Sequence, residues 1–144
     1  MKVSLNRAEA LGAAGRSLRK SCLKVMRAEG ARRDTVVSVT VLDEAEMSEL
    51  NRRYLSRQGP TDVLAFPLGE DSEEGYLLGD VLICPQLILA RRGEYGVVKG
   101  RELDFVAAHG VLHLLGYDDG DDEGAAIMDR RLREVLGLPG GDAG

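Results

Sequence analysis

The spacing of apolar residues along the chain predicts strands that alternate with amphipathic helices. Short apolar or β-branched runs are typical of strands, whereas apolar residues that recur every three or four positions are typical of one helical face. The segments with strand character are residues 1–5, 35–42, 62–66 and 77–84. The segments with helical periodicity are residues 9–29, 85–95, 99–115 and 121–136, with a further helix that starts at Asp43.

Local start and stop signals mark the ends of these elements. Gly30 ends the first helix, and the Gly-Pro pair at 59–60 ends the helix that starts at Asp43. Asp43 and Glu46 have the spacing of a capping box, in which each side chain accepts a hydrogen bond from the other residue's backbone. The segment at residues 69–75, which is acidic and has a glycine at each end, predicts a turn between two strands.

This mixture of elements predicts a single domain over residues 1–144, of the α/β or α+β class. We expect a small mixed sheet of about four strands packed with about five helices, followed by a flexible tail at about residues 138–144. A chain of 144 residues with 44% hydrophobic content is long enough to bury one core. It contains neither an apolar run of about 18 residues nor a secretory signal, so we expect a cytoplasmic protein without a membrane segment.

Composition adds two expectations. Cys22 and Cys84 lie in different predicted elements and form no C-x-x-C motif, which favours buried free thiols. The net charge of −5 is unevenly spread, because residues 1–33 carry +7 and the remainder carries −12. Such asymmetry is typical of a surface that contacts phosphate, although a solvated helix face gives the same pattern.

The two histidines of the chain offer the clearest candidate chemistry. His109 and His113 are four residues apart on a predicted helix, so their side chains share one face and can bind one metal ion. Gly116 follows the last helical residue and can turn the chain back, which makes Asp118 or Asp119 the first carboxylate able to return. The spacing favours Asp119, because it matches the metal-binding helix of the metzincin proteases.

A purely structural interpretation of the same residues is also available. A pair of histidines can simply occupy polar helix positions, and acidic residues suit the start of the helix at 121–136. Gly110 favours the functional interpretation over the purely structural one, because a glycine inside a helix costs about 0.5 to 1 kcal/mol of stability relative to alanine. We therefore expect a close approach of backbone or substrate there. Gly110 also occupies the place of the general-base glutamate in H-E-x-x-H proteases, which disfavours peptide hydrolysis by that mechanism.

Three sequence blocks resemble the YbeY family of bacterial rRNA-maturation endoribonucleases. Residues 109–119, "HGVLHLLGYDD", are similar to the family signature H-G-x-L-H-L-x-G-Y-D-H. Residues 50–67, "LNRRYLSRQGPTDVLAFP", are similar to L-N-x-x-Y-R-x-x-D-x-P-T-D-V-L-S-F-P, and residues 78–84, "LGDVLIC", to a G-D-I-x-I segment. The blocks follow the family's order.

The resemblance implies a zinc-dependent endoribonuclease that cuts single-stranded RNA. It implies a role in 16S rRNA 3′-end maturation and ribosome quality control, with rRNA and components of the 30S subunit as partners. The sequence does not fix the oligomeric state, for which a monomer is favoured over a dimer. His109 and His113 fall on the first two zinc ligands, and His113 is also predicted to be catalytic. The third ligand of the family, a histidine, falls on Asp119, whose negative charge would make the metal a weaker Lewis acid.

Two smaller departures concern the block at residues 50–67. The family's arginine after the tyrosine falls on Leu55, and its serine before Phe-Pro falls on Ala65. Arg57 could replace the missing guanidinium in stabilising the reacting phosphate, so we predict that it is catalytic. Arg52, Arg53 and Arg57 are the predicted RNA-binding residues.

Two other functions are compatible with the sequence. The first is a ribosome-assembly factor that binds RNA and protein while its metal site is degenerate or structural. The second is a metalloprotease, which the metzincin-like spacing favours and Gly110 opposes.

Overall fold

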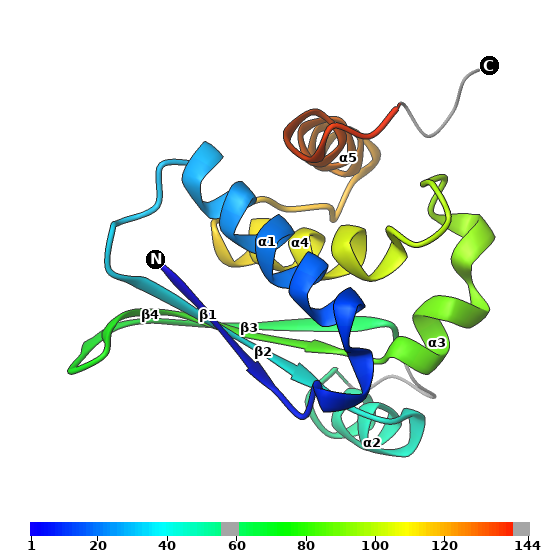
Figure 1. Ribbon diagram of the computed structural model, residues 1–144, viewed down its shortest axis with the longest axis horizontal. Helices are drawn as coiled ribbons and strands as arrows, with labels where there is room; N and C mark the ends of the chain where they lie inside the picture. The colour runs from blue at the N-terminus through cyan, green and yellow to red at the C-terminus, as the bar shows by residue number, and fades with distance from the viewer. Residues whose placement is uncertain (56–60, 140–144) are drawn as a thin grey trace.

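The computed structural model describes residues 1–55 and 61–139, and it has a four-stranded sheet with helices on both faces (Figure 1). The strands are β1 (Lys2–Asn6), β2 (Thr35–Val41), β3 (Val63–Ser72) and β4 (Gly75–Ile83). The α-helices are α1 (Ala13–Ala28), α2 (Glu44–Leu55), α3 (Pro85–Ala90), α4 (Glu102–Leu114) and α5 (Asp122–Leu136), with short 3-10 helices η1 (Glu9–Leu11) and η2 (Arg92–Glu94). This single α+β domain confirms the predicted fold class.

The sheet is mixed, and its strand order is β1-β2-β4-β3. β1, β2 and β4 are parallel, whereas β3 runs antiparallel to β4. α1 joins β1 to β2, as expected, because parallel strands need a long crossover. β3 lies at the edge of the sheet and has no further strand beside it in the described part of the chain.

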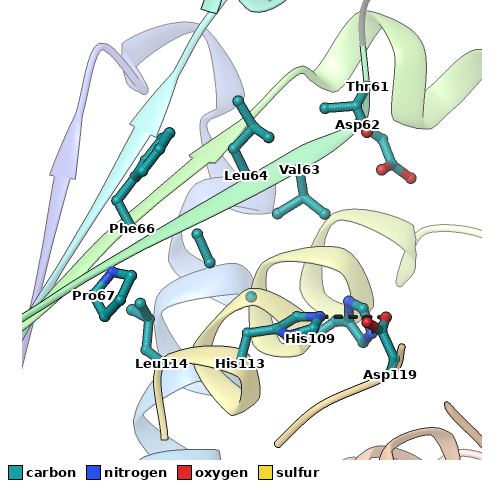
Figure 2. A pocket seen from close by; sticks show the side chains of 12 residues that line it. Thr61, Asp62, Val63, Leu64, Phe66, Pro67, His109, His113, Leu114 and Asp119 are labelled. Atoms are coloured by element: carbon teal, nitrogen blue, oxygen red, sulfur yellow. Dashed lines mark ion pairs between the residues drawn. The ribbon is translucent and has the colours of Figure 1, made fainter. Parts of the chain in front are cut away.

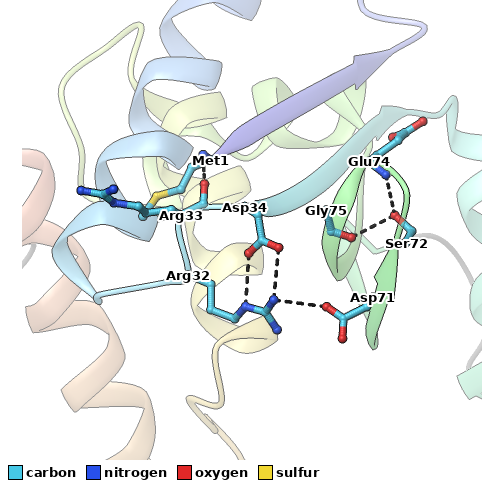
Figure 3. A network of polar contacts seen from close by, with 8 residues as sticks. All are labelled: Met1, Arg32, Arg33, Asp34, Asp71, Ser72, Glu74 and Gly75. Atoms are coloured by element: carbon cyan, nitrogen blue, oxygen red, sulfur yellow. Dashed lines mark hydrogen bonds and ion pairs between the residues drawn. The ribbon is translucent and has the colours of Figure 1, made fainter.

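The predicted acidic turn at residues 69–75 is wrong, because most of that segment is strand. β3 continues to Ser72, which pairs with Gly75 at the start of β4. The Ser72 hydroxyl donates to the Gly75 carbonyl over 2.9 Å and accepts from the Glu74 backbone N–H over 3.1 Å. Figure 3 shows these contacts closing a tight turn.

Contacts with a distant residue explain why the hairpin extends so far. The Arg32 guanidinium lies 3.2 Å from Asp71 on the hairpin and 3.1 Å from Asp34 at the start of β2 (Figure 3). It also lies over the ring of Tyr76, 4.7 Å from the ring centroid. Acidic composition predicted a turn, but Arg32 offsets part of that charge and supports continued strand pairing.

α4 is the central helix of the fold. α1 and α4 cover one face of the sheet, with α5 outside them, and α2 packs on the opposite face (Figure 1). Val81 and Ile83 of β4 point into the core on the α4 side, whereas Leu82 between them packs with Met47 of α2. This alternation is the two-residue period of a strand that is covered on both faces.

A buried carboxylate ties the start of α4 to α1. Asp104 is 1% exposed, and it accepts hydrogen bonds from the hydroxyls of Ser17 and Ser21, over 2.6 Å and 3.1 Å. Arg101 adds a third donor at 2.9 Å. A buried charge with this many donors is compensated, so it fixes the position of α4 against α1.

Several predicted helix ends are shifted, each at an identifiable residue. Gly12 has φ of 54° and separates η1 from α1, so the helix predicted over residues 9–29 begins at Ala13. Gly100, with φ of 99°, precedes α4, which begins at Glu102. At the C-terminus, Leu138 is 8% exposed and belongs to the core, whereas residues 140–144 of the predicted tail lie outside the described residues.

Local predictions of caps and thiols are confirmed. The backbone N–H of Glu46 donates to Asp43 over 2.8 Å, and that of Asp43 donates to Glu46 over 3.0 Å, which is the predicted capping box. Cys22 and Cys84 are both free and buried, and burial raises the pKa of the Cys22 thiol to about 12. None of the described helices has the length and apolar character needed to cross a bilayer.

Gly110 marks the closest approach of α4 to the sheet. A Cβ atom at this position would lie 2.7 Å from Cγ1 of Val81 and 3.3 Å from Cγ2 of Val63. Both distances are shorter than ordinary van der Waals contact, and β-branched valine has little freedom to move aside. The glycine predicted to permit a close approach therefore does so towards β3 and β4.

We expect Gly110→Ala to lower the free energy of unfolding by about 1 to 2 kcal/mol. Overpacking of a buried site costs about 1 to 3 kcal/mol, which exceeds the gain of about 0.5 to 1 kcal/mol from replacing a helical glycine. Urea denaturation followed by circular dichroism measures the change. Gly93→Ala is the matched control, because a Cβ there has no atom within 4 Å and should change stability by less than about 0.5 kcal/mol. A stabilised Gly110→Ala protein would contradict this account.

Candidate metal centre

α4 presents two histidines at the edge of the sheet. Most side chains of this helix are buried, but the side chains of His109 and His113 are 26% and 30% exposed. Their ring centroids are 4.8 Å apart, and the ring planes are inclined at 86°. One helical turn thus places both Nε2 atoms at the mouth of the same pocket (Figure 2).

The chain reverses directly after α4. The N–H of Tyr117 donates to the carbonyl of Leu112, and the N–H of Gly116 donates to that of His113, over 3.1 Å in each case. This pair of bonds is the Schellman motif, which needs a residue of positive φ, and Gly116 has φ of 108°. The Tyr117 hydroxyl also donates to Glu29 at the C-cap of α1, which anchors the returning chain.

The two aspartates after this turn have different contacts. Asp118 accepts a hydrogen bond from the backbone N–H of Gly120 over 2.9 Å and so shapes the loop. Asp119 faces the histidines, with its Oδ2 atom 3.3 Å from Nε2 of His113 and 3.5 Å from Nε2 of His109. The predicted ligand set, with Asp119 rather than Asp118, is therefore assembled in space.

The spacing of these atoms fits a tetrahedral metal ion. One ligand atom from each of the three residues lies within 4.8 Å of the others. Ligand atoms about 2.0 to 2.1 Å from zinc stand about 3.3 Å apart in a tetrahedron, close to the two distances from Asp119. Three protein ligands leave a fourth position open, as in catalytic sites. Within residues 1–55 and 61–139, no other group of three such side chains meets the same criterion.

Electrostatics favour the ligating form of one histidine. Burial, together with the neighbouring His113, lowers the pKa of His109, although the nearby aspartates oppose this shift. A lowered pKa keeps the imidazole neutral at neutral pH, with a nitrogen lone pair available for a metal.

A pocket of about 460 Å³ extends from the histidines along the edge strand. One wall is α4, and the other is the segment of residues 61–67 at the start of β3 (Figure 2). Ala65, which replaces the family's serine, lies in this second wall. The free edge of β3 thus runs beside the candidate metal centre.

Arg52 and Arg53, two of the three predicted arginines, do not line this pocket. Arg52 and Arg53 are exposed on α2, which packs on the face of the sheet opposite α4. Arg52 pairs with Glu49 at 2.7 Å, whereas Arg53 has no ion pair with any of the described residues. Arg57 lies outside the described residues, as does the side chain of Leu55.

Asp62 lines the pocket, although the sequence analysis did not predict it as a site residue. Its Oδ2 atom accepts a hydrogen bond from the Tyr95 hydroxyl over 2.8 Å. The two residues are 33 positions apart, so no local pattern could reveal the contact.

Comparisons with known proteins identify relatives over most of the chain. The family model described as endoribonuclease YbeY matches residues 6–138. Endoribonuclease YbeY of Pelotomaculum thermopropionicum is 42% identical over 125 residues, covering 83% of this chain and 82% of that protein. The Moorella thermoacetica protein of the same name is 40% identical over 149 residues, covering 94% and 96%. The solution structure of TM1509 from Thermotoga maritima is similar, with a TM-score of 0.61, 26% identity and coverage of 94% and 89%.

We expect the protein to bind one zinc ion per chain and Asp119→Ala to weaken that binding by at least about 100-fold. Loss of a residue that only orients a ligand already costs about 10- to 100-fold, so loss of a ligand should cost no less. Competition with a chromophoric chelator measures the affinity. Asp118→Asn is the matched control and should bind zinc like the wild type, because its amide oxygen can still accept the Gly120 N–H that shapes the loop. Equal losses from both substitutions would contradict the geometry.

Proposed function

We propose, because this chain belongs to the YbeY family of endoribonucleases, that it is a zinc-dependent enzyme that cleaves single-stranded RNA in 16S rRNA 3′-end maturation and ribosome quality control. The supporting observation is the meeting of two imidazoles and one carboxylate at a pocket beside an edge strand. The proposed setting is the cytoplasm, with rRNA and 30S components as partners.

The proposed zinc ligands are His109, His113 and Asp119. A zinc ion in this position would supply Lewis acidity towards a phosphodiester oxygen and lower the pKa of a bound water. The residues fit such an ion because they offer nitrogen and oxygen donors at suitable separations. The carboxylate of Asp119 is a normal zinc ligand. The preceding residue, Asp118, holds the loop that presents Asp119, because it accepts a hydrogen bond from the Gly120 N–H.

The chain's own side chains would position the RNA. Tyr54 is 59% exposed at the end of α2, and its ring lies edge-on to Phe66, with centroids 5.9 Å apart. Phe66 lines the pocket, so a base stacked on Tyr54 would lie near its mouth. Arg53 on the same helix offers a cation for a phosphate. Arg57 is proposed from the family resemblance alone to contact the reacting phosphate.

A protease is disfavoured by the packing around Gly110. The glutamate that acts as general base in H-E-x-x-H proteases has no counterpart at this position. A side chain there would also meet Val81, because its Cβ would lie only 2.7 Å from that residue. The remaining alternative is an assembly factor that binds RNA without cutting it.

We expect zinc-loaded protein to cleave single-stranded RNA and His113→Ala to reduce the rate by at least about 100-fold, because metal chemistry contributes several kcal/mol to such reactions. A labelled RNA oligonucleotide resolved on a gel measures the cleavage, and a chelator followed by added zinc should abolish and restore it. Asp119→His, which recreates the family's ligand set, should retain cleavage.

Intact RNA together with unchanged binding to 30S subunits would support the assembly factor. Cleavage of unstructured protein alone would support the protease.

We expect Arg53→Ala to weaken binding of single-stranded RNA and to reduce the slope of log affinity against log salt by about 1, as for one lost phosphate contact. Arg52→Ala should have a smaller effect, because its guanidinium is already paired with Glu49. Fluorescence anisotropy over a salt series, with both changes made in the His113→Ala background, measures binding without cleavage. Equal effects of the two substitutions would show that the ion pair does not matter.

A further inference from the structure

A second hollow adjoins the candidate metal centre. It has a volume of about 350 Å³ and is lined in part by His109 and Asp119, so we call it the side pocket. Its remaining wall comes from Asp62 and Val63 of the β3 segment, from Tyr95, and from α4 and α5. Any ligand here would lie directly beside a group bound at the metal centre.

The floor of the side pocket is apolar and firmly held. Phe105 and Val106 of α4 are 8% and 3% exposed. Tyr95 lies against Phe105, with ring centroids 6.4 Å apart. Arg133 supports both aromatic residues, because its guanidinium lies 4.9 Å from the Phe105 ring centroid and donates to the Tyr95 carbonyl over 2.6 Å. Phe105 and Tyr95 are therefore both held in place by Arg133.

Two carboxylates at the rim each present an unused acceptor. Asp62 receives the Tyr95 hydroxyl on Oδ2, and Asp129 receives Nε of Arg133 on Oδ2 over 2.9 Å. Across the described ranges 1–55 and 61–139, no hydrogen bond reaches the Oδ1 atom of either residue. Each carboxylate is thus oriented by a fixed donor and has one oxygen available to a ligand.

These features limit the kind of ligand. Negative charge at the rim disfavours a phosphate. A hard cation prefers six or more oxygen ligands, whereas the walls here are largely apolar and aromatic. A flat heteroaromatic ring with N–H donors on its edge satisfies both the apolar floor and the carboxylates.

We propose that the side pocket is a nucleobase subsite that favours bases with an exocyclic amino group over uracil. The proposal rests on the proposed RNA cleavage, since it assigns the base next to the phosphate at the metal centre. Cytosine, adenine and guanine can donate an amino N–H to a carboxylate, as cytosine N4 does to Asp or Glu in other complexes. Uracil carries carbonyl oxygens at the corresponding edge, which would face the carboxylate without a hydrogen bond.

The test compares zinc-loaded cleavage of oligocytidylate and oligouridylate of equal length. We expect wild type to prefer oligocytidylate by about 10-fold in kcat/KM, since one good pair discriminates by about 1 to 3 kcal/mol. Asp129→Asn should reduce this ratio at least about 5-fold, because an amide can also donate to a uracil carbonyl. The ratio is measured on one preparation, so it does not depend on the folded fraction.

Asp122→Asn is the matched control, because it removes an acidic residue from the same helix outside the side pocket and should preserve the ratio. Zinc content should be unchanged in both variants. Equal wild-type rates on the two oligomers, or an unchanged ratio in Asp129→Asn, would overturn the subsite and leave the proposed function standing. Cleavage of neither oligomer by zinc-loaded wild type would overturn the proposed function, and the subsite with it.

Discussion

The close contact between α4 and the sheet is the constraint on which the site depends. Gly110 has no side chain, so the helix lies directly against Val81 and Val63 near the sheet edge. The preceding residue, His109, and the one a turn after it, His113, then emerge where the sheet ends. A larger residue at position 110 would push the helix outward and displace both imidazoles from the β3 wall. The glycine therefore couples core packing to the geometry of the ligands.

The loop between α4 and α5 brings a carboxylate back beside α4 after the chain has left that helix. Gly116 provides the reversal, and Asp118 fixes the turn that follows it. Glu29 at the C-cap of α1 holds the loop from the other side, because it accepts hydrogen bonds from both the Tyr117 hydroxyl and Arg131 of α5. Asp119 can thus face two histidines while adjacent acidic residues serve structure alone.

The parts of the fold and site that could be predicted from sequence are those set by local spacing. The proximity of His109, His113 and Asp119 was predictable because the three residues lie within eleven positions, joined by one helix and one glycine turn. The long hairpin could not be predicted from local spacing, because the strand pairing of Asp71 is supported by Arg32, which lies far away in sequence. The side pocket could not be predicted from the sequence either. Its residues come from β3, from the position after η2, from α4 and from α5, and only the tertiary fold brings them together.

If the chain binds a metal ion and RNA as proposed, the charges around the centre link the two binding steps. Asp62, Asp119 and Asp129 place negative charge where a phosphodiester would have to lie. Without a cation, these carboxylates repel the RNA backbone at short range, and the more basic residues lie elsewhere, as Arg53 on α2 does. A divalent ion bound there would reverse the local sign, so that one phosphate would become favourable at the centre while the side pocket would still exclude its neighbours. By reciprocity, bound RNA would then strengthen metal binding.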